Sequence, residues 1–366
     1  MLEKGRISSR QAILLMISTM LPTAILAVPG VVIERARQDA LFSLGLATLA
    51  ALLISRIVVN LGLRFPNKTL FEYAEVLLGR SVGKVVGFVY LWWLLHTNAI
   101  IIDEFASLPC VALMPETPFI VFFAIGIGVA GYAVYNGLEV LGRYNELIAP
   151  IGIGLILAMF VLLLGEMKVT RGLPLFEAGL PRVVKGAVTP AAYLGEIIIF
   201  SMIIPYVNRS ENAQRMADIA VLSTSFLTTL ATVGLLAVFG PTVASAWTFP
   251  AFNAVRAVVI ANVLERLESV VIMVWVLAGI AKIGVFYYAA ALGSVQWMGL
   301  RDYRPLVAPI GLVLLGLAHL CDNIVDLLDF LARTFPTYAL LVFEFGVPLL
   351  MLLVVAVKGK RGATDA

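Results

Sequence analysis

A single lysine lies deep within one of the apolar stretches of this chain, and its chemistry demands an explanation. Lys282 follows Trp-Val-Leu-Ala-Gly-Ile-Ala at 275–281 and precedes Ile-Gly-Val-Phe at 283–286. An ionisable side chain inside a long apolar helix is costly, so it usually faces a partner or a ligand. It also lies too far from either end of the stretch for its ammonium to reach water. Lys282 is therefore a candidate for ligand binding or for replacing a bound cation; the alternative is a structural pair with a carboxylate.

Glu196 is the second candidate, because it follows Gly195 in the middle of another apolar stretch. Pro190 and Pro205 lie on either side, and glycine and proline both weaken a helix, so we expect a break near Gly195. A carboxylate at such a break can receive a ligand ammonium or pair with Lys282. The alternative is that the break only lets water reach Glu196.

Proline also interrupts the first apolar stretch. Pro22 precedes Thr23, Ala24 and Ile25, and a second proline follows at position 29. If a half-helix begins here, its free backbone N–H groups could bind the carboxylate of an amino acid. The carbonyl groups freed at 22–24 could in turn accept hydrogen bonds from Lys282. Prolines that only kink a membrane helix are common. We favour a break, because the interruptions of the first and sixth stretches occupy equivalent places.

Other side chains extend this candidate pocket. They are Trp93, His96 and Thr97 on the third stretch, Phe200 after the break expected near Gly195, and Tyr287 after Lys282. Aromatic residues at this depth pack more often than they bind, so packing stays the alternative for all of them.

Four further charged residues fall within or beside the apolar stretches. We interpret Arg56 and Glu344 as interior pairs or deep interfacial contacts, and Asp103 and Glu104 as solvated at the outer end of the third stretch.

Ten apolar segments must position these residues, and they fill almost the whole chain. Hydrophobic residues make up 61% of the sequence and charged residues 13%, with a mean hydropathy of +0.99, which is far from the composition of a soluble domain. A membrane-spanning helix needs about 20 apolar residues. The predicted spans are 11–32, 40–62, 84–106, 118–138, 144–165, 188–206, 216–240, 268–297, 303–321 and 337–357. We therefore predict an all-α integral membrane protein with a single domain over 1–366.

Lys and Arg are more frequent in the connections that lie inside if the N-terminus is cytoplasmic, so both termini are predicted to be cytoplasmic. The connection at 166–187, with four basic residues, is the main exception. A net charge of +3 gives no reason to expect nucleic acid.

The spans divide into two groups of five with matching plans. A short amphipathic helix is predicted after the second span of each group, at 69–78 and 249–264. An odd number of spans per group inverts the second group, as in transporters of the LeuT and amino acid–polyamine–organocation type, whose broken helices 1 and 6 surround a midplane site. We predict inverted repeats over about 11–165 and 188–357.

Other functions receive little support. No cluster of His, Cys or carboxylates has metal-ligand spacing, and there is no phosphate-binding glycine loop or paired Ser and His. We therefore expect no enzyme activity, no metal and no cofactor. Cys110 and Cys321 both fall near the predicted outer face, but inert packing is more common than a disulfide.

Six segments, in this order and spacing, resemble the B subunit of nutrient germinant receptors of spore-forming bacteria, the GerAB-type spore germination proteins. They are 65–73 (Phe-Pro-Asn-Lys-Thr-Leu-Phe-Glu-Tyr), 114–118 (Met-Pro-Glu-Thr-Pro), 137–143 (Gly-Leu-Glu-Val-Leu-Gly-Arg), 205–208 (Pro-Tyr-Val-Asn), 264–268 (Leu-Glu-Arg-Leu-Glu) and 302–305 (Asp-Tyr-Arg-Pro). The resemblance implies a ten-helix transporter-like fold in the spore inner membrane. It also implies binding of a small nutrient such as an amino acid, and work with an A-type subunit and a C-type lipoprotein subunit.

Two alternatives stay open. A proton-coupled amino acid permease would have the same fold, with Lys282 or Glu196 as its proton-responsive group. A membrane scaffold whose pocket has lost its ligand is the third possibility. A receptor needs partner subunits, because this chain has no soluble signalling domain, whereas a permease needs none.

Overall fold

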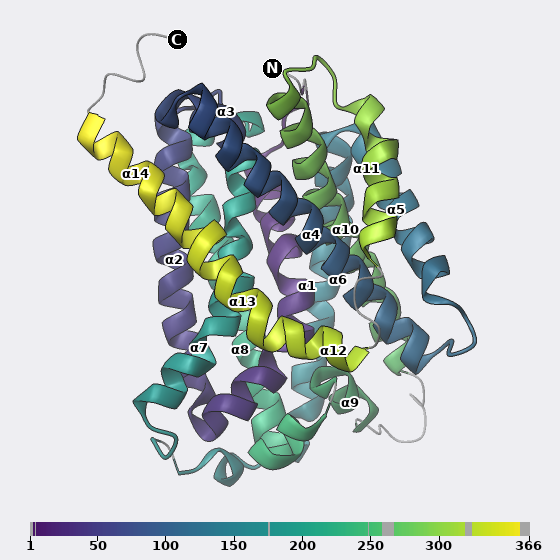
Figure 1. The fold of residues 1–366 in the computed structure, drawn as a ribbon. Helices are drawn as coiled ribbons and strands as arrows, with labels where there is room; N and C mark the ends of the chain where they lie inside the picture. The colour runs from purple at the N-terminus through teal and green to yellow at the C-terminus, as the bar shows by residue number, and fades with distance from the viewer. Residues whose placement is uncertain are drawn as a thin grey trace.

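The computed structural model describes residues 3, 5–174, 176–247, 249–257, 267–318 and 324–358, and helices account for most of them (Figure 1). The main elements are α1 (Ser9–Ala36), α2 (Ala40–Arg64), α3 (Leu70–Leu78), α4 (Arg80–Ala112), α5 (Phe119–Asn136), α6 (Leu138–Leu163), α7 (Leu180–Gly195), the 3₁₀ segment η4 (Glu196–Met202), α8 (Ala213–Ala246), α9 (Pro250–Ala257), α10 (Leu267–Met298) and α11 (Arg304–Leu317). The last span combines α12 (Ile324–Asp329), the π-helical η7 (Phe330–Thr334), α13 (Phe335–Tyr338), the π-helical η8 (Ala339–Gly346) and α14 (Val347–Lys358).

The predicted all-α membrane fold is confirmed, and each predicted span falls on helical structure. Among the described residues, eight helical stretches are long and apolar enough to cross a membrane. One of them, Ser9–Arg64, contains both α1 and α2, joined by a 3₁₀ turn, and the apolar α11 is only 14 residues long. The protein is therefore an integral membrane protein, although α11 is shorter than a full span. The repeat boundaries stay a prediction.

The connections gather at two opposite ends of the molecule, as up-and-down spans require. At one end Glu3 accepts a hydrogen bond from Tyr303, Ile7 pairs with Val207, and Lys358 donates to a carbonyl of α3. At the other end Asp39 accepts from two backbone N–H groups in the loop before α7. The first end contains the connections predicted to be cytoplasmic.

The predicted break in the sixth span is confirmed. The α-helix α7 ends at Gly195, and Glu196 begins seven residues of 3₁₀-helix. A 3₁₀ run of this length is unusual, because its hydrogen bonds are poorer than those of an α-helix. The break places Glu196 where one helix type changes to the other.

The first span differs from the prediction, because α1 is continuous from Ser9 to Ala36 with Pro22 and Pro29 inside it. Proline lacks an N–H group, but its φ angle suits a helix, so it can remove hydrogen bonds without unwinding the chain. The N–H groups of Thr23 to Ile25 therefore lie inside a helix. The anion site expected at the start of a half-helix is not formed in this state.

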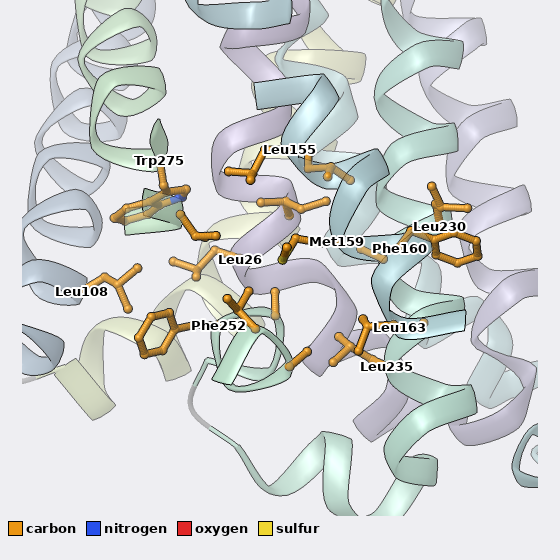
Figure 2. Close-up of a pocket in the computed structure, with 18 residues that line it drawn as sticks. Leu26, Leu108, Leu155, Met159, Phe160, Leu163, Leu230, Leu235, Phe252 and Trp275 are labelled. Atoms are coloured by element: carbon orange, nitrogen blue, oxygen red, sulfur yellow. The ribbon is translucent and has the colours of Figure 1, made fainter. Parts of the chain in front are cut away.

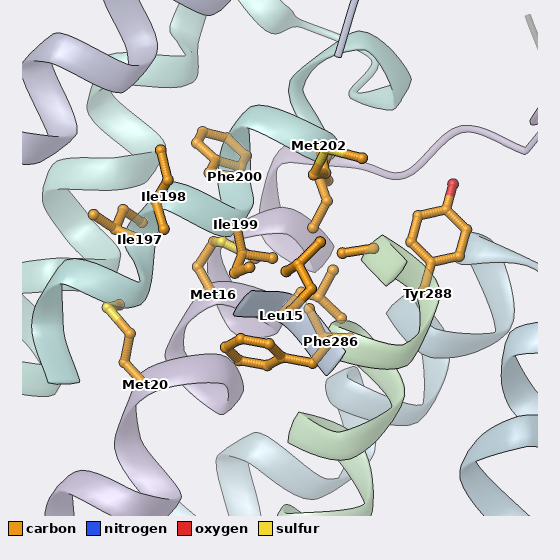
Figure 3. Close-up of a cluster of buried hydrophobic side chains, with 14 of the residues drawn as sticks. Leu15, Met16, Met20, Ile197, Ile198, Ile199, Phe200, Met202, Phe286 and Tyr288 are labelled. Atoms are coloured by element: carbon orange, nitrogen blue, oxygen red, sulfur yellow. The ribbon is translucent and has the colours of Figure 1, made fainter. Parts of the chain in front are cut away.

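Apolar side chains pack α1, η4 and α10 together beside the break. Figure 3 shows Leu15, Met16 and Met20 of α1 gathered with the isoleucines of η4 and with Phe286 of α10. All of these side chains are buried. Dense packing of this kind fixes the backbone that carries Lys282 and Glu196.

Small residues allow α4 and α10 to approach closely. A Cβ atom at Gly279 would lie 2.1 Å from the ring of Phe105, which itself stacks on Trp275 at 4.1 Å between ring centroids. Close to this contact, the Asn98 amide donates to the carbonyl of Ile283, beside Lys282. The third and eighth spans are thus joined next to the buried lysine.

The predicted accessory helices are present, the second in part. α3 is the helix predicted at 69–78, and its apolar face is buried. α9 begins at Pro250 within the predicted 249–264 segment, and positions 258–264 lie outside the described residues. The same holds for Cys321, so the disulfide with Cys110 stays untested.

Candidate functional site

Lys282 lies at the centre of a buried polar cluster. Its Nζ donates to both oxygens of Glu196, at 2.8 Å to Oε1 and 2.6 Å to Oε2, and to Oγ1 of Thr23 at 2.5 Å. The side chains of Lys282 and Glu196 are 0% and 1% exposed. The cluster therefore joins α1, the start of η4 and α10 in the interior of the protein.

The described hydrogen bonds of the Lys282 ammonium all go to Glu196 and Thr23. The two oxygens of Glu196 belong to one carboxylate, and Lys282 forms no other ion pair within the described ranges. The rings of Tyr193 and Phe286 each lie 5.8 Å from Nζ, within the range of a cation–π contact. Lys282 is thus held by charge, hydrogen bonds and aromatic rings at once.

Three residues of the first span lie beside this cluster. The carbonyl of Pro22 accepts a hydrogen bond from Nε1 of Trp275 at 3.2 Å. Ala24 is buried in a core cluster that also contains Tyr193. Ile25 is half-buried and lines an apolar cavity.

Two predicted residues of the third span are buried close by. Trp93 stacks on Phe343 at 5.3 Å and meets the edge of Phe286 at 6.2 Å, so one ring separates it from Lys282. Thr97 is 1% exposed, and its hydroxyl has no hydrogen-bond partner among the described residues. Trp93 is thus one ring away from Lys282, and Thr97 is a buried polar side chain on the same helix as Trp93.

Three predicted residues are not brought to the cluster. His96 stacks on the half-exposed Trp92 and contacts the hydroxyl of Tyr338, on another face of α4. Tyr287 donates to the carbonyl of Val307 on α11. Phe200 is buried in the hydrophobic core beyond the break (Figure 3).

Three further carboxylates are buried in the protein. Glu344 is 0% exposed, and a Cβ atom at Gly195 would lie 2.1 Å from its Oε2. Asp103 and Glu104 are 8% and 2% exposed, so the prediction that they are solvated is wrong. The reason is that α4 continues to Ala112, beyond the predicted end of the span at 106.

Arg56, in contrast, is exposed on α2 rather than paired in the interior. The depth of Glu344 in the last span is evident from the sequence, but its contact with Gly195 is not.

A basic cavity opens at the end of α1, α7 and η7. It has a volume of about 540 Å³ and is lined by Glu34, Arg35, Arg182, Lys185, Val188, Arg333 and Thr337. Arg35 is fixed in its wall, because it donates to the carbonyls of Lys185 and Ala332 and to the hydroxyl of Thr189. We call this cavity the basic vestibule.

The basic vestibule lies above the cluster along the same helices. Tyr193, one turn beyond Thr189 on α7, lies between the two and packs against Phe335 with ring centroids 6.3 Å apart. Both rings follow lining residues along the chain, Val188 and Arg333, but they are not part of the lining of the basic vestibule.

A second cavity is apolar and lies between α1, α6, α8, α9 and α10. Figure 2 shows Leu26, Met159, Phe252 and Trp275 around it, and its volume is about 120 Å³. The lining presents almost no polar atoms, so this cavity does not suit a charged amino acid.

The chain is similar to known proteins over nearly its whole length. The model of the spore germination protein family matches residues 6–323. The chain is 25% identical to spore germination protein KB of Bacillus subtilis (strain 168) over 98% of its length and 97% of that protein. It is 26% identical to spore germination protein YndE of the same strain, over 98% of both chains. The crystal structure of MhsT in complex with L-phenylalanine superposes with a TM-score of 0.62 at 14% identity, covering 96% of this chain and 99% of that chain, which confirms the LeuT-like fold.

Proposed function

Because this chain belongs to the spore germination protein family, we propose that it is the nutrient-binding membrane subunit of a germinant receptor in the inner membrane of the spore. The nutrient is a small molecule such as an amino acid. It binds in the middle of the membrane beside Lys282, Glu196 and Thr23.

The observation that carries this proposal is the buried cluster itself. Lys282 joins Glu196, where α7 changes to 3₁₀-helix, to Thr23, which follows Pro22 in α1. At Pro22 the helix α1 lacks one backbone N–H donor, and at Glu196 the sixth span changes to the poorer hydrogen bonds of a 3₁₀-helix. A nutrient with a carboxylate and an ammonium competes for the same charges, so its binding changes how α1, η4 and α10 are held together.

That change supplies a signal. A ligand shifts a conformational equilibrium only if it binds one state more tightly than the other. The cluster lies between the basic vestibule and the end where Ile7 pairs with Val207, just beyond η4. We infer that nutrient enters from the vestibule side, which is the outer side if the N-terminus is cytoplasmic, and that the rearrangement is passed to A-type and C-type partner subunits.

The test is binding without accumulation. Purified protein in liposomes should bind radiolabelled amino acids from a panel of the proteinogenic L-amino acids, without concentrating them under a pH or sodium gradient. A matched sample carrying Lys282→Met should not bind. Failure of the wild-type protein to bind any amino acid would contradict the proposal.

A proton-coupled amino acid permease is the second candidate, and one observation favours it. The Lys282–Glu196 pair is titratable, fully buried and located between two opposed ends of a transporter-like fold. The liposome experiment separates the two functions, because gradient-driven accumulation of an amino acid would support the permease and overturn the receptor.

A further inference from the structure

Glu344 is a buried carboxylate whose charge has no partner in the described part of the chain. Its side chain is 0% exposed, and neither carboxylate oxygen has a hydrogen-bond partner there. Burying an ionised carboxylate without a partner costs several kcal/mol, so such a group is ionised only when a positive species lies beside it and is otherwise a neutral acid. Glu344 also lies in the π-helical η8, and π-helical turns occur frequently at functional sites.

The nearest buried cation does not pair with Glu344. Lys282 donates its described hydrogen bonds to Glu196 and Thr23, and neither oxygen of Glu344 bonds with it. Since Glu196 already neutralises Lys282, an ionised Glu344 has no counter-charge among the described residues.

The surroundings of Glu344 suit an organic ammonium better than a metal ion. Phe343, the residue before Glu344, packs with Tyr90 and Trp93, and the centroids of these three rings lie 5.3 to 6.1 Å apart. Metal ions such as Ca²⁺ need six or more oxygen ligands, whereas an ammonium group can be held by one carboxylate and the faces of aromatic rings. Within the described ranges, no three His, Cys, Asp or Glu side chains are arranged to hold a metal ion.

Glu344 lies directly against the break in the sixth span. A Cβ atom at Gly195 would be 2.1 Å from its Oε2, so the carboxylate occupies the space that a side chain at Gly195 would take. Gly195 directly precedes Glu196, so a group bound to Glu344 would lie beside the Lys282 cluster and would touch both the break and η8.

We propose that Glu344 receives the ammonium group of the nutrient, so that the nutrient class is a primary amine, and for an amino acid the carboxylate lies toward Lys282. This inference rests on the proposed function. It adds that an amine is required and that one named carboxylate, on the last span, recognises it.

The experiment compares ligand pairs and variants in lipid nanodiscs. Each radiolabelled L-amino acid that binds the wild-type protein is paired with its deaminated carboxylic acid. Glu344→Gln keeps the size of the side chain and removes its charge, and Glu139→Gln makes the same change at a half-exposed position at the start of α6, where the residue pairs with Arg143. Loss of an opposite charge at a buried contact should weaken binding of the amino acid about 30-fold or more in Glu344→Gln. The deaminated acid should bind wild type and Glu344→Gln equally, and Glu139→Gln should match wild type.

The other outcomes overturn either this inference alone or the proposed function together with it. If Glu344→Gln binds the amino acid as tightly as wild type, the carboxyl group is a protonated acid and the inference is overturned. If Glu344→Gln does not fold, the wild-type protein decides, because equal affinity for the amino acid and its deaminated acid also overturns the inference. If no amino acid binds the wild-type protein, the proposed function fails, and this inference fails with it.

Discussion

Replacing Lys282 by methionine tests the central ion pair most directly. The sequence alone suggests that a neutral residue of similar length leaves the fold intact. The structure changes this expectation, because Glu196 is 1% exposed and both of its oxygens depend on Lys282. Lys282→Met should therefore lower the stability of the protein as well as its response to nutrient.

The magnitude follows from what the substitution leaves behind. Removing one partner of a buried ion pair costs about 3–5 kcal/mol, because the other charge stays buried. The hydroxyl of Thr23 also loses its partner. The double variant Lys282→Met with Glu196→Met removes both charges, and replacing a buried pair by hydrophobic residues of similar volume is often close to neutral. Most of the lost stability should therefore return in the double variant, while binding does not.

The assay measures stability and function on the same three proteins. Thermal unfolding in nanodiscs should give the order wild type, then the double variant, then Lys282→Met with the lowest midpoint. Nutrient-triggered germination of spores that carry each variant should fail for both. The reasoning is refuted if Lys282→Met unfolds at the wild-type midpoint or if the double variant is no more stable than the single.

Three further outcomes are expected. Gly195→Ala should destabilise the protein, because overpacking against Glu344 costs about 1–3 kcal/mol while the helix propensity of alanine returns only about 1 kcal/mol. In Gly152→Ala the new Cβ atom meets nothing within 4 Å, so this variant should be neutral or stabilising. Equal unfolding midpoints for the two variants would contradict this expectation. Arg333→Gln should slow the association of a carboxylate-bearing amino acid several-fold at low salt and much less at high salt, because Arg333 lines the basic vestibule. Stopped-flow measurements test this, and an effect that does not depend on salt would argue against electrostatic steering by the basic vestibule. Asp39→Ala should cost about 1–3 kcal/mol by leaving two backbone N–H groups without their acceptor, which faster hydrogen exchange in the loop before α7 would reveal.

Much of the fold could be predicted because the bilayer imposes it. Apolar length locates the spans, and a glycine between the prolines at 190 and 205 locates the break at Gly195, since both residue types act through the local backbone. The depth of Lys282 and the position of Glu196 at a break made their pairing a natural possibility. The continuity of α1 was harder to predict, because proline inside a membrane helix is compatible with either a kink or a break.

The rest of the site depends on packing that the sequence does not reveal. Both faces of α4 are apolar, so no pattern distinguishes Thr97, which is buried, from His96, which faces the last span. The burial of Glu104 follows from two additional turns of α4 that extend past the predicted span. The contact between Glu344 and Gly195 depends on the π-helical register of η8, which shifts side chains around the helix axis in a way that no hydropathy pattern encodes.

The 3₁₀ form of η4 also gives the sixth span a mechanical property. A 3₁₀-helix rises about 2.0 Å per residue and an α-helix about 1.5 Å, so the seven residues of η4 would shorten by roughly 3.5 Å if they became α-helical. One end of η4 is Glu196, and beyond the other end Val207 is paired with Ile7 before α1. A switch of helix type would thus act as a short linear stroke between the middle of the membrane and one of its surfaces. Spin labels on Val184 and Asn208 would register that stroke as a change in their separation when nutrient binds.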